Sequence, residues 1–238
     1  MKKLGIIGGT SWNSTRLYYD HINTLVARRM GGLHSARLVL ESLDLAPYAA
    51  LQMKGKTDEA EKLIVAAGLS LLSAGAEAIL IASNTTNRYG PAVARATGLP
   101  LLPIADPTIA ALKKAGHRRI ALLGTRYTMI EDFGRTPYED AGLDVVPIAP
   151  DWIATVDRII FDELAKGVVR RDSQRAFKTL FTELDRAKVD AVVLGCTELV
   201  LAVDPRANVL PVFDTTELHA RSAVDWMLSD EEGAKQAA

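Results

Sequence analysis

The chain contains the same arrangement of residues twice, and this duplication limits the folds that it can adopt. The segment 75–86 is an apolar run that ends in Ser-Asn-Thr-Thr, and the segment 188–199 is a similar run that ends in Cys-Thr-Glu-Leu. Two further pairs of segments recur in the same way, 4–10 with 120–126 and 102–106 with 210–214. Because the three pairs occur in the same order and at nearly the same separation, we infer an internal duplication.

Short apolar runs alternate along the chain with longer segments in which apolar residues recur at helical spacing. This alternation predicts βαβ units, and runs that are apolar throughout are typical of parallel strands covered on both faces. The predicted strands are 4–7, 36–41, 78–82, 101–104, 120–123, 144–148, 191–194 and 209–212. Pro147 restricts 144–148 to the edge of a sheet or the end of a strand, because proline cannot donate a ladder hydrogen bond.

Three helices are predicted from caps and periodicity. The first opens with Thr57 as its cap, and Gly75 ends it. A second opens at Asp172 or Ser173. Its apolar face would consist of Phe177, Leu180, Phe181 and Leu184. A third, over 215–228, is expected to return to the first half of the chain, because it follows the second copy of the repeat.

Together these patterns predict an α/β fold of two Rossmann-like, doubly wound domains related by pseudo-two-fold symmetry. The first domain would comprise residues 1–106 and 215–238, and the second residues 107–214. In open α/β sheets, ligands bind beyond the carboxyl ends of the strands. We therefore expect an active site in the cleft between the domains, with Ser83 and Cys196 on opposite walls.

Composition excludes several classes of function. The 238 residues carry a formal net charge of −1 without a basic stripe, which argues against a nucleic-acid partner. The apolar runs are far shorter than a membrane span, and the first residues reach glycines before a signal-peptide core forms. The single cysteine cannot form an intramolecular disulfide, and no zinc-site spacing is present. We expect a soluble, cytoplasmic protein without structural metal.

Cys196 is the strongest candidate for a catalytic residue. It follows an apolar strand and precedes Thr197, where a helix is expected to begin. A helix N-terminus lowers a thiol pKa and makes a thiolate available near neutral pH. A buried structural cysteine is the alternative, since free cysteines are common in cores. The duplication favours chemistry, because the equivalent position holds Ser83, again small, polar and at a strand end.

The polar residues beside the strand ends suit an anionic ligand. Asn84 and Thr85 offer amide, hydroxyl and backbone donors for a carboxylate, although such residues also form ordinary turns. Gly8-Gly9-Thr10 matches neither a phosphate-binding loop nor the dinucleotide fingerprint, and it allows either close approach of a small anion or a tight turn. The four histidines have no ligand spacing and are expected at the surface or in the core.

Five motifs resemble those of the aspartate/glutamate racemase family, and they extend over essentially the whole chain. They are Gly8-Gly9-Thr-Ser-Trp12, His34-Ser-Ala-Arg37, Ser83-Asn84-Thr85, Gly195-Cys196-Thr197-Glu198 and the segment 212–219. The resemblance is greatest to the branch specific for L-aspartate and L-glutamate, which carries a hydroxyl residue in place of the first cysteine. It implies two Rossmann-like domains, an interdomain site, no cofactor and frequent dimers.

The resemblance also implies a two-base racemisation, in which one group removes the α-proton of an amino acid and another returns a proton to the opposite face. Cys196 would be the base, and Ser83 the group opposite. The substrate-binding residues would be Gly9, Thr10, Gln52, Asn84, Thr85, Thr125, Thr197 and Glu198. Gln52 would lie in a loop that closes over the site. Because a serine hydroxyl is a far poorer base than a thiol, we expect an asymmetric reaction.

Four positions depart from the family pattern. Thr10 and Asn13 stand where that branch often has Met and Glu, and Asn87 stands where a histidine is common. Lys166 lies only near the position of the usual lysine. These changes leave the substrate open among aspartate, glutamate and a related amino acid.

Two alternatives remain open at this point. One is a single-cysteine isomerase or decarboxylase of a small dicarboxylate, because the decarboxylases of the superfamily keep only the second-half thiol. The other is a catalytically impaired paralogue that binds carboxylates without turnover. In each case we expect a small-molecule carboxylate as the partner, a homodimer, and neither nucleic acid nor membrane.

Overall fold

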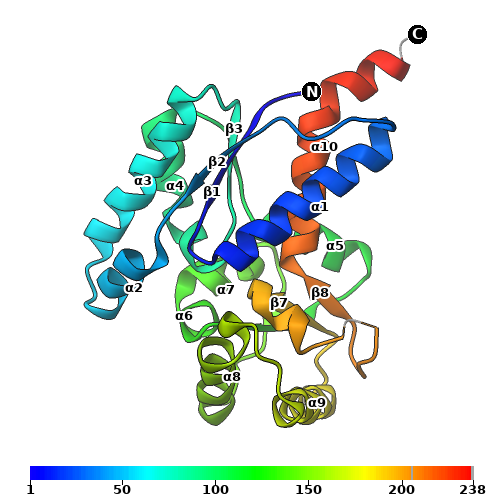
Figure 1. Cartoon of the computed structure of the whole chain (residues 1–238). Coiled ribbons are helices and arrows are strands. Elements are labelled where there is room, and N and C mark those ends of the chain that lie inside the picture. The colour runs from blue at the N-terminus through cyan, green and yellow to red at the C-terminus, as the bar shows by residue number, and fades with distance from the viewer. Residues whose placement is uncertain (205, 237–238) are drawn as a thin grey trace. The chain divides into compact units, whose positions relative to one another are not determined.

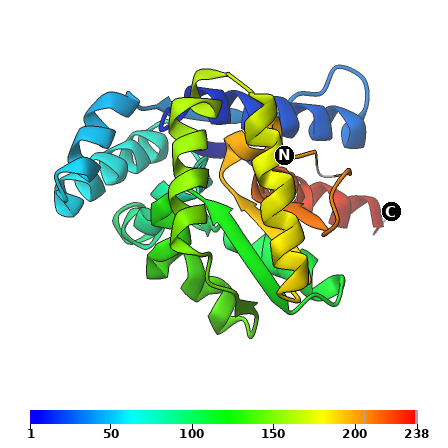
Figure 2. The ribbon, with the colours of Figure 1, turned by 90° about the horizontal axis from the view of Figure 1, so that it is seen from below.

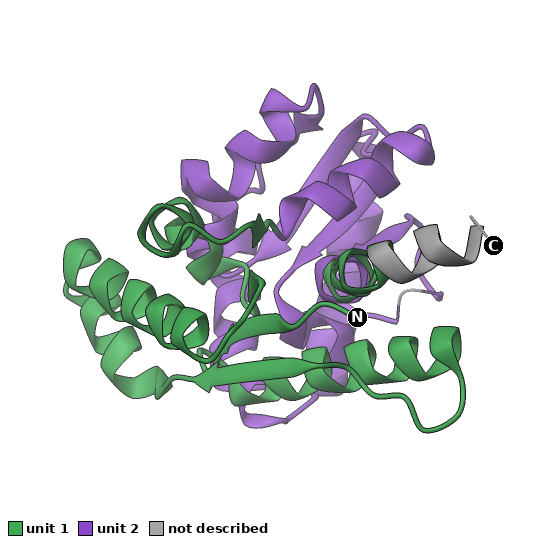
Figure 3. Ribbon diagram, turned by 90° about the horizontal axis from the view of Figure 1, so that it is seen from above, with its two compact units in different colours: residues 1–103, 219–238 green, residues 104–218 purple. Residues whose placement is uncertain are grey.

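The computed structural model describes residues 1–204 and 206–236, and Figure 1 shows its ribbon. The chain divides into two compact units, residues 1–103 with 219–238 and residues 104–218, which Figure 3 distinguishes by colour. The last two residues of the predicted first-domain range, 237–238, lie outside the described part. The domain boundaries inferred from the sequence stay a prediction.

The first unit is built on a parallel sheet of four strands in the order β2-β1-β3-β4. The strands are β1 (Leu4–Gly8), β2 (Leu38–Ser42), β3 (Ala78–Ile81) and β4 (Leu101–Leu102). Leu4 of β1 lies opposite Leu38 on one side and Ala78 on the other, and all three pairings are parallel. The central strands β1 and β3 are buried along their whole length, as their continuous apolar sequence predicts.

Helices cover both faces of this sheet. They are α1 (Trp12–Met30), α2 (Leu45–Met53), α3 (Thr57–Ser73), α4 (Gly90–Thr97) and α10 (Thr215–Gln236), with the short 3-10 helix η1 (Thr85–Tyr89) before α4. On one face, α1 and α10 lie side by side and pack on Leu4, Ile6 and Leu80 (Figure 1). On the other face, α3 and α4 pack on Ile7 and Ile79. The expected return of the last helix to the first half is thus confirmed.

A buried tyrosine–histidine pair fastens α10 to the rest of the first unit. The Tyr18 hydroxyl lies 2.9 Å from Nδ1 of His219, and Nε2 of His219 lies 2.9 Å from the Leu102 carbonyl oxygen. Because a carbonyl can only accept, Nε2 carries the proton and Nδ1 accepts from Tyr18. Complete burial lowers the pKa of His219 to about 4, so the ring is neutral. His219 is therefore a satisfied core histidine.

The second unit repeats the topology of the first. Its parallel sheet has the order β6-β5-β7-β8, which is the first unit's order with each strand replaced by its counterpart in the repeat. The strands are β5 (Arg119–Gly124), β6 (Asp144–Val145), β7 (Ala191–Gly195) and β8 (Val212–Asp214). Two sheets of equal strand order are what an internal duplication predicts, and the predicted α/β class is confirmed.

Helices also cover both faces of the second sheet. They are α5 (Ala105–Lys114), α6 (Arg126–Ile130), α7 (Asp132–Asp140), α8 (Pro150–Asp162) and α9 (Arg171–Arg186), with the 3-10 helices η2 (Leu164–Lys166) and η3 (Thr197–Leu201). Figure 2 shows α8 and α9 side by side over the sheet, where they pack on Leu123 and Leu194. Helices α5 and α7 pack on the opposite face, around Leu122 and Val193.

Several element ends differ from the sequence predictions. The strand predicted at 101–104 ends at Leu102, because Ile104 is helical and precedes α5. The strand predicted at 209–212 begins only at Val212, and the one predicted at 144–148 keeps two residues before Pro147. The strand predicted at 36–41 is β2, which starts two residues later.

The helix ends show similar shifts. Thr57 is the first residue of α3 and not its cap, since Lys56 holds the cap position without a side-chain hydrogen bond. Helix α9 begins at Arg171, just before the predicted Asp172 or Ser173. None of the helices in the described ranges is both long and apolar enough to span a bilayer.

Candidate functional site

The carboxyl ends of β1 and β3 bring together most of the predicted site residues of the first unit. Because these strands are neighbours in a parallel sheet, the residues that follow Gly8 and Ile81 emerge at the same edge. Thr10 follows β1, and its hydroxyl lies 3.4 Å from that of Thr86, which follows β3. The other predicted residues of this edge are Gly9, Ser83, Asn84 and Thr85, of which the last three are half-buried. Five predicted residues therefore share one sheet edge.

Gly9 gives this edge its shape. Its φ of +82° lies in the region that favours glycine, and a Cβ at this position would come within 2.0 Å of the Leu43 carbonyl oxygen. The backbone N–H of Gly9 donates to the hydroxyl of Thr15 at 2.8 Å. The glycine is therefore required for the close passage of β1 past Leu43, and its own N–H is used within the protein.

Ser83 sits at the turn after β3, and Asn87 holds that turn. The Thr86 N–H points at Oγ of Ser83 across a long 3.4 Å. The side-chain amide of Asn87 donates to the Ile81 carbonyl at 2.9 Å and to the Ser83 carbonyl at 2.7 Å. Asn87, which stands where a histidine is common in the family, thus fixes the backbone of Ser83. The sequence did not reveal this role.

We expected Gln52 in a loop, and this prediction was wrong. Gln52 lies in the last turn of helix α2. An alanine-rich segment with Asp44 as its cap forms this helix, and the Asp44 carboxylate accepts from the Ala46 N–H at 3.1 Å. The Nε2 atom of Gln52 is buried and has no hydrogen-bond partner in the described part of the chain. A buried, unused donor of this kind is costly, which makes Gln52 a candidate for a ligand contact.

Cys196 lies at the corresponding place of the second unit, directly after β7, and caps η3. Its thiol donates to Oε2 of Glu198 at 3.0 Å, and the hydroxyl of Thr197 donates to the same oxygen at 2.7 Å. Cys196, Thr197 and Glu198 are only 8%, 4% and 8% exposed, respectively. The thiol of Cys196 is therefore hydrogen-bonded to the carboxylate of Glu198 at an almost completely buried position.

The environment of Cys196 overturns the expectation of a lowered thiol pKa. Burial raises the pKa of Cys196 well above its ordinary value, and the charge of Glu198 together with its hydrogen bond acts in the same direction. Asp157 of α8 adds a smaller effect of the same sign, while the Glu198 N–H opposes it. The helix that follows has only five residues of 3-10 type, so its dipole is weak. Cys196 is held as a thiol.

Thr125 stands beside this group at the end of β5, the neighbour of β7. It caps α6, and its hydroxyl lies 3.3 Å from that of Thr128. The strand ends approach closely, since a Cβ on Gly124 would come within 2.7 Å of the Gly195 carbonyl oxygen. Thr125, Cys196, Thr197 and Glu198 therefore lie at one sheet edge of the second unit.

A buried glutamate anchors the segment that carries Lys166. Glu163 is 2% exposed and accepts from the Ser173 hydroxyl at 2.6 Å and from Arg158 at 3.2 Å. Its carbonyl oxygen accepts from the backbone N–H groups of Lys166 and Val168. The Lys166 side chain itself is exposed. Sequence reasoning missed Glu163, because nothing in its spacing indicates a carboxylate buried at the end of a helix.

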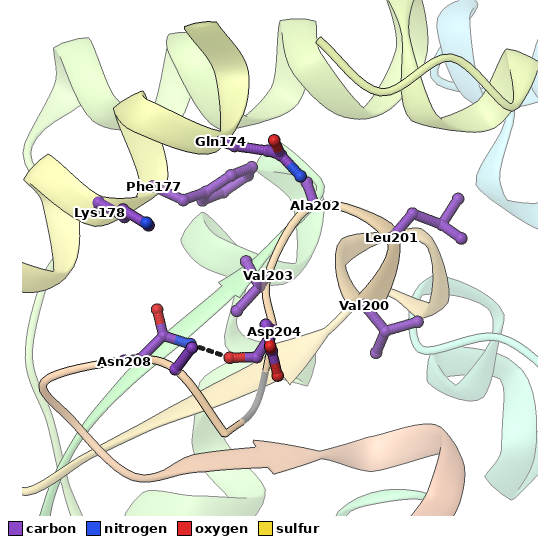
Figure 4. Close-up of a pocket in the computed structure, with 10 residues that line it drawn as sticks. Gln174, Phe177, Lys178, Val200, Leu201, Ala202, Val203, Asp204 and Asn208 are labelled. Carbon is purple, nitrogen blue, oxygen red and sulfur yellow. Dashed lines mark hydrogen bonds between the residues drawn. The ribbon is translucent and has the colours of Figure 1, made fainter. Parts of the chain in front are cut away.

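The second unit also contains a cavity of about 410 Å³ between α9 and the residues 200–204 and 207–208 (Figure 4). Gln174, Phe177 and Lys178 line it from α9. Its remaining lining residues are Val200, Leu201, Ala202, Val203, Asp204, Ala207 and Asn208, so no predicted site residue borders it. The Asn208 amide is bonded to the Asp204 carbonyl. The residues assigned to chemistry thus belong to the strand ends and not to this cavity.

Comparison with known proteins agrees with this architecture. The fold and the sites at the strand ends define an α/β protein with two parallel-sheet units and a free thiol at a strand end. The sequence matches the Asp/Glu/Hydantoin racemase family over residues 7–223. The chain therefore belongs to that family, and it is an isomerase of the racemase type. Within the described residues, no cluster of three or more histidine, cysteine or acidic side chains could hold a metal ion.

Individual relatives cover nearly the whole chain. A broad specificity amino-acid racemase, RacX of Bacillus subtilis (strain 168), is 22% identical and aligns with 95% of this chain and 98% of its own. A protein of Yersinia pestis assigned to the Asp/Glu racemases is 41% identical, with a TM-score of 0.90 over 96% of this chain and 100% of its own. An aspartate racemase homologue of Pyrococcus horikoshii OT3 is 32% identical, with a TM-score of 0.82 over 95% and 99%.

Proposed function

We propose that this protein is a cofactor-independent amino-acid racemase in which Cys196 is the base and Ser83 acts on the opposite face of the α-carbon. The observation that carries the proposal is the equivalence of the two strand ends. Cys196 follows β7 and Ser83 follows β3, and these strands hold the same position in sheets of equal order. A duplicated scaffold thus offers one proton-transfer group from each copy.

The surroundings of both groups suit an amino-acid carboxylate. The α-proton of an amino acid is a very weak acid, so hydrogen-bond donors must stabilise the charge that develops on its carboxylate. Asn84 and Thr85 in the first unit and Thr125 in the second are amide and hydroxyl donors at the two sheet edges, whereas the hydroxyl of Thr197 already donates to Glu198. We assign the carboxylate to these side chains, and a second contact to the unused amide of Gln52.

The two groups make the reaction asymmetric. A thiol becomes a thiolate at a pKa near 8.5 in ordinary surroundings, whereas a serine hydroxyl ionises far less readily. Ser83 is therefore suited to donate a proton to a carbanion and poorly suited to remove one from carbon. Since two enantiomers are equally stable, kcat/KM must be equal in both directions, and the asymmetry appears in kcat and KM taken separately.

Racemisation assays on three variants test this assignment. Optical rotation is followed with L- and D-forms of aspartate, glutamate and other amino acids. Cys196→Ala should lower kcat by about 10²- to 10⁴-fold, the usual contribution of a general acid or base, and Ser83→Ala should lower it as well. Ser70→Ala, at an exposed serine of α3 outside all five family motifs, is the control. Full activity in Cys196→Ala would exclude the proposal.

The substrate is aspartate, glutamate or a related amino acid. The relatives named above support this range, since one is a broad specificity amino-acid racemase and another an aspartate racemase homologue. We further propose a homodimer, as the family resemblance implies, which light scattering would test. A reducing, cytoplasmic location fits the single free thiol.

A second candidate is favoured by the presence of only one cysteine, at the end of β7. A single thiol could protonate the carbanion left by decarboxylation of a substituted malonate, or add to maleate and isomerise it. Release of carbon dioxide from malonates, or conversion of maleate to fumarate, without loss of optical activity from any amino acid would favour this candidate. Thermal stabilisation by dicarboxylates without any turnover would instead indicate a binding paralogue.

A further inference from the structure

One oxygen of Glu198 receives two hydrogen bonds, and one of them comes from the only thiol in the chain. Sγ of Cys196 lies 3.0 Å and Oγ1 of Thr197 lies 2.7 Å from Oε2 of Glu198. The carboxylate therefore touches the sulfur that the proposed reaction uses. It is also nearly buried, so it is poorly placed to be merely a solvated charge.

We propose that Glu198 is the proton acceptor of Cys196, and that the two form a thiol–carboxylate pair sharing one proton. The inference rests on the proposed function for its place in a reaction, but the pair itself is a property of the free protein. Glu198 was assigned to substrate binding from the sequence. In the arrangement described here it acts through Cys196, as a positioning residue that holds the thiol and takes its proton.

Charge explains why a shared proton suits this site. If the thiol lost its proton to solvent, two negative charges would face each other in a buried environment, which is strongly unfavourable. If the proton moves from Sγ to Oε2, a thiolate and a neutral carboxylic acid form, and the pair keeps a single negative charge. The site can then supply a thiolate without gathering a second charge beside an anionic substrate.

The protons balance over one cycle of the proposed racemisation. The pair begins as thiol and carboxylate, and transfer of the thiol proton gives thiolate and carboxylic acid. The thiolate takes the α-proton, and the C–H electron pair stays on the substrate carbanion. Ser83 then donates its hydroxyl proton to the opposite face of that carbon and becomes an alkoxide. The proton held by Glu198 returns through solvent to Ser83, which restores both groups.

The other charges around the thiol leave Glu198 as its acceptor. Asp157 of α8 disfavours an isolated thiolate, but its Oδ1 accepts from the backbone N–H of Arg126 at 2.8 Å. From η2, the neighbour of η3, Glu163 is bonded to Ser173 and Arg158 as described above, and the Lys166 side chain is exposed. Glu198 is the carboxylate bonded to the sulfur.

Alkylation of the thiol tests the pair directly, because Cys196 is the only cysteine. The rate with iodoacetamide is measured at several pH values. In the wild type, the shared proton makes the reactive form a constant fraction, so the rate should be flat between about pH 6 and pH 7.5. In Glu198→Gln, the thiol can ionise only to solvent, so the rate should rise about 30-fold over this range.

Controls separate the pair from general effects. Asp157→Asn removes a nearby carboxylate that has no hydrogen bond to the sulfur in the described structure, and it should keep the flat profile. Cys196→Ser gives the blank. A wild-type rate that rises tenfold per pH unit from pH 6, or a Glu198→Gln profile as flat as the wild type, would overturn the proposal. The wild-type profile alone decides the matter if Glu198→Gln fails to fold.

The same proteins distinguish a failure of this inference from a failure of the proposed function. The expected alkylation profiles without racemisation of any amino acid would leave the pair intact and remove the racemase assignment. Racemisation with a steep wild-type alkylation profile would do the reverse. If both are correct, kcat/KM of Glu198→Gln should fall below the wild type at pH 6 and recover with rising pH.

Discussion

The neutral state of His219 predicts that the first unit loses stability in mild acid. His219 is completely buried between Tyr18 and the Leu102 carbonyl, and its pKa is lowered from 6.5 to about 4. The unfolded chain therefore binds a proton on this residue that the folded chain rejects. Stability from this group is fully present above pH 6.5 and is lost as the pH falls toward 4.

The magnitude follows from the two pKa values. The difference between 6.5 and about 4 corresponds to about 3 kcal/mol at a pH below both values, and about 2.5 kcal/mol of this is already lost at pH 4.5. A loss of this size is large against the total stability of a typical domain, which is about 5–15 kcal/mol. It should be visible as a shift of the urea midpoint.

The assay compares the wild type with His219→Gln by urea unfolding at pH 7 and at pH 4.5. Trp226 packs against the cluster that contains α1 and α10, so its fluorescence reports the first unit. Replacing Trp12 and Trp152 by phenylalanine in both proteins removes the other two signals. The variant keeps His21, His34 and His117, so the difference between the two pH values isolates His219.

We expect the wild type to lose about 2.5 kcal/mol more than His219→Gln between the two pH values. The variant is expected to be less stable at pH 7, since it loses well-made buried hydrogen bonds, but that loss does not enter the comparison. An equal loss in the two proteins would refute the reasoning, because it would mean that His219 takes up its proton in the folded state as readily as in the unfolded one.

Three further predictions concern single positions. Gly9→Ala should destabilise the protein by well over about 1 kcal/mol in urea unfolding, because its Cβ would meet the Leu43 carbonyl at 2.0 Å; Gly31→Ala, with a similar φ of +78° and nothing within 4 Å, should cost less, and equal costs would contradict this. Ser173→Ala should lower the free energy of unfolding in urea by about 1–3 kcal/mol, because it leaves a buried carboxylate oxygen of Glu163 without its donor. Thr179→Ala, on the exposed side of α9, should be nearly neutral in the same assay. Asn87→Ala should lower the kcat of racemisation, because the Asn87 amide fixes the backbone carbonyl of Ser83. A lower melting temperature with an unchanged kcat would argue against that role.

The sequence predicted the fold best where strands are covered on both faces. The cores of β1, β3, β5 and β7 were found correctly, since a strand buried on both sides must be apolar throughout. The outer strands were misjudged at their ends. For β4 and β8, only two or three residues pair, and where they stop depends on the helix that follows.

The candidate site was predictable in position but not in its electrostatics. The duplication located Ser83 and Cys196 at equivalent strand ends, because the carboxyl ends of parallel strands are set by topology. The thiol pKa was predicted in the wrong direction, since its main causes are burial and the carboxylate of Glu198, which depend on side-chain geometry. The contact of Asn87 with the Ser83 carbonyl likewise has no signal in the spacing of residues.

Hydrogen–deuterium exchange at the α-carbon in heavy water tests the central claim most directly. If Cys196 is the base, the enantiomer whose α-hydrogen faces it should gain deuterium without inversion faster than it inverts, because an exchanged thiol can return a deuteron to the same face. The opposite enantiomer, facing Ser83, should gain deuterium only with inversion, and Cys196→Ala should show neither process. Equal exchange without inversion in both enantiomers, or exchange that persists in Cys196→Ala, would contradict the account.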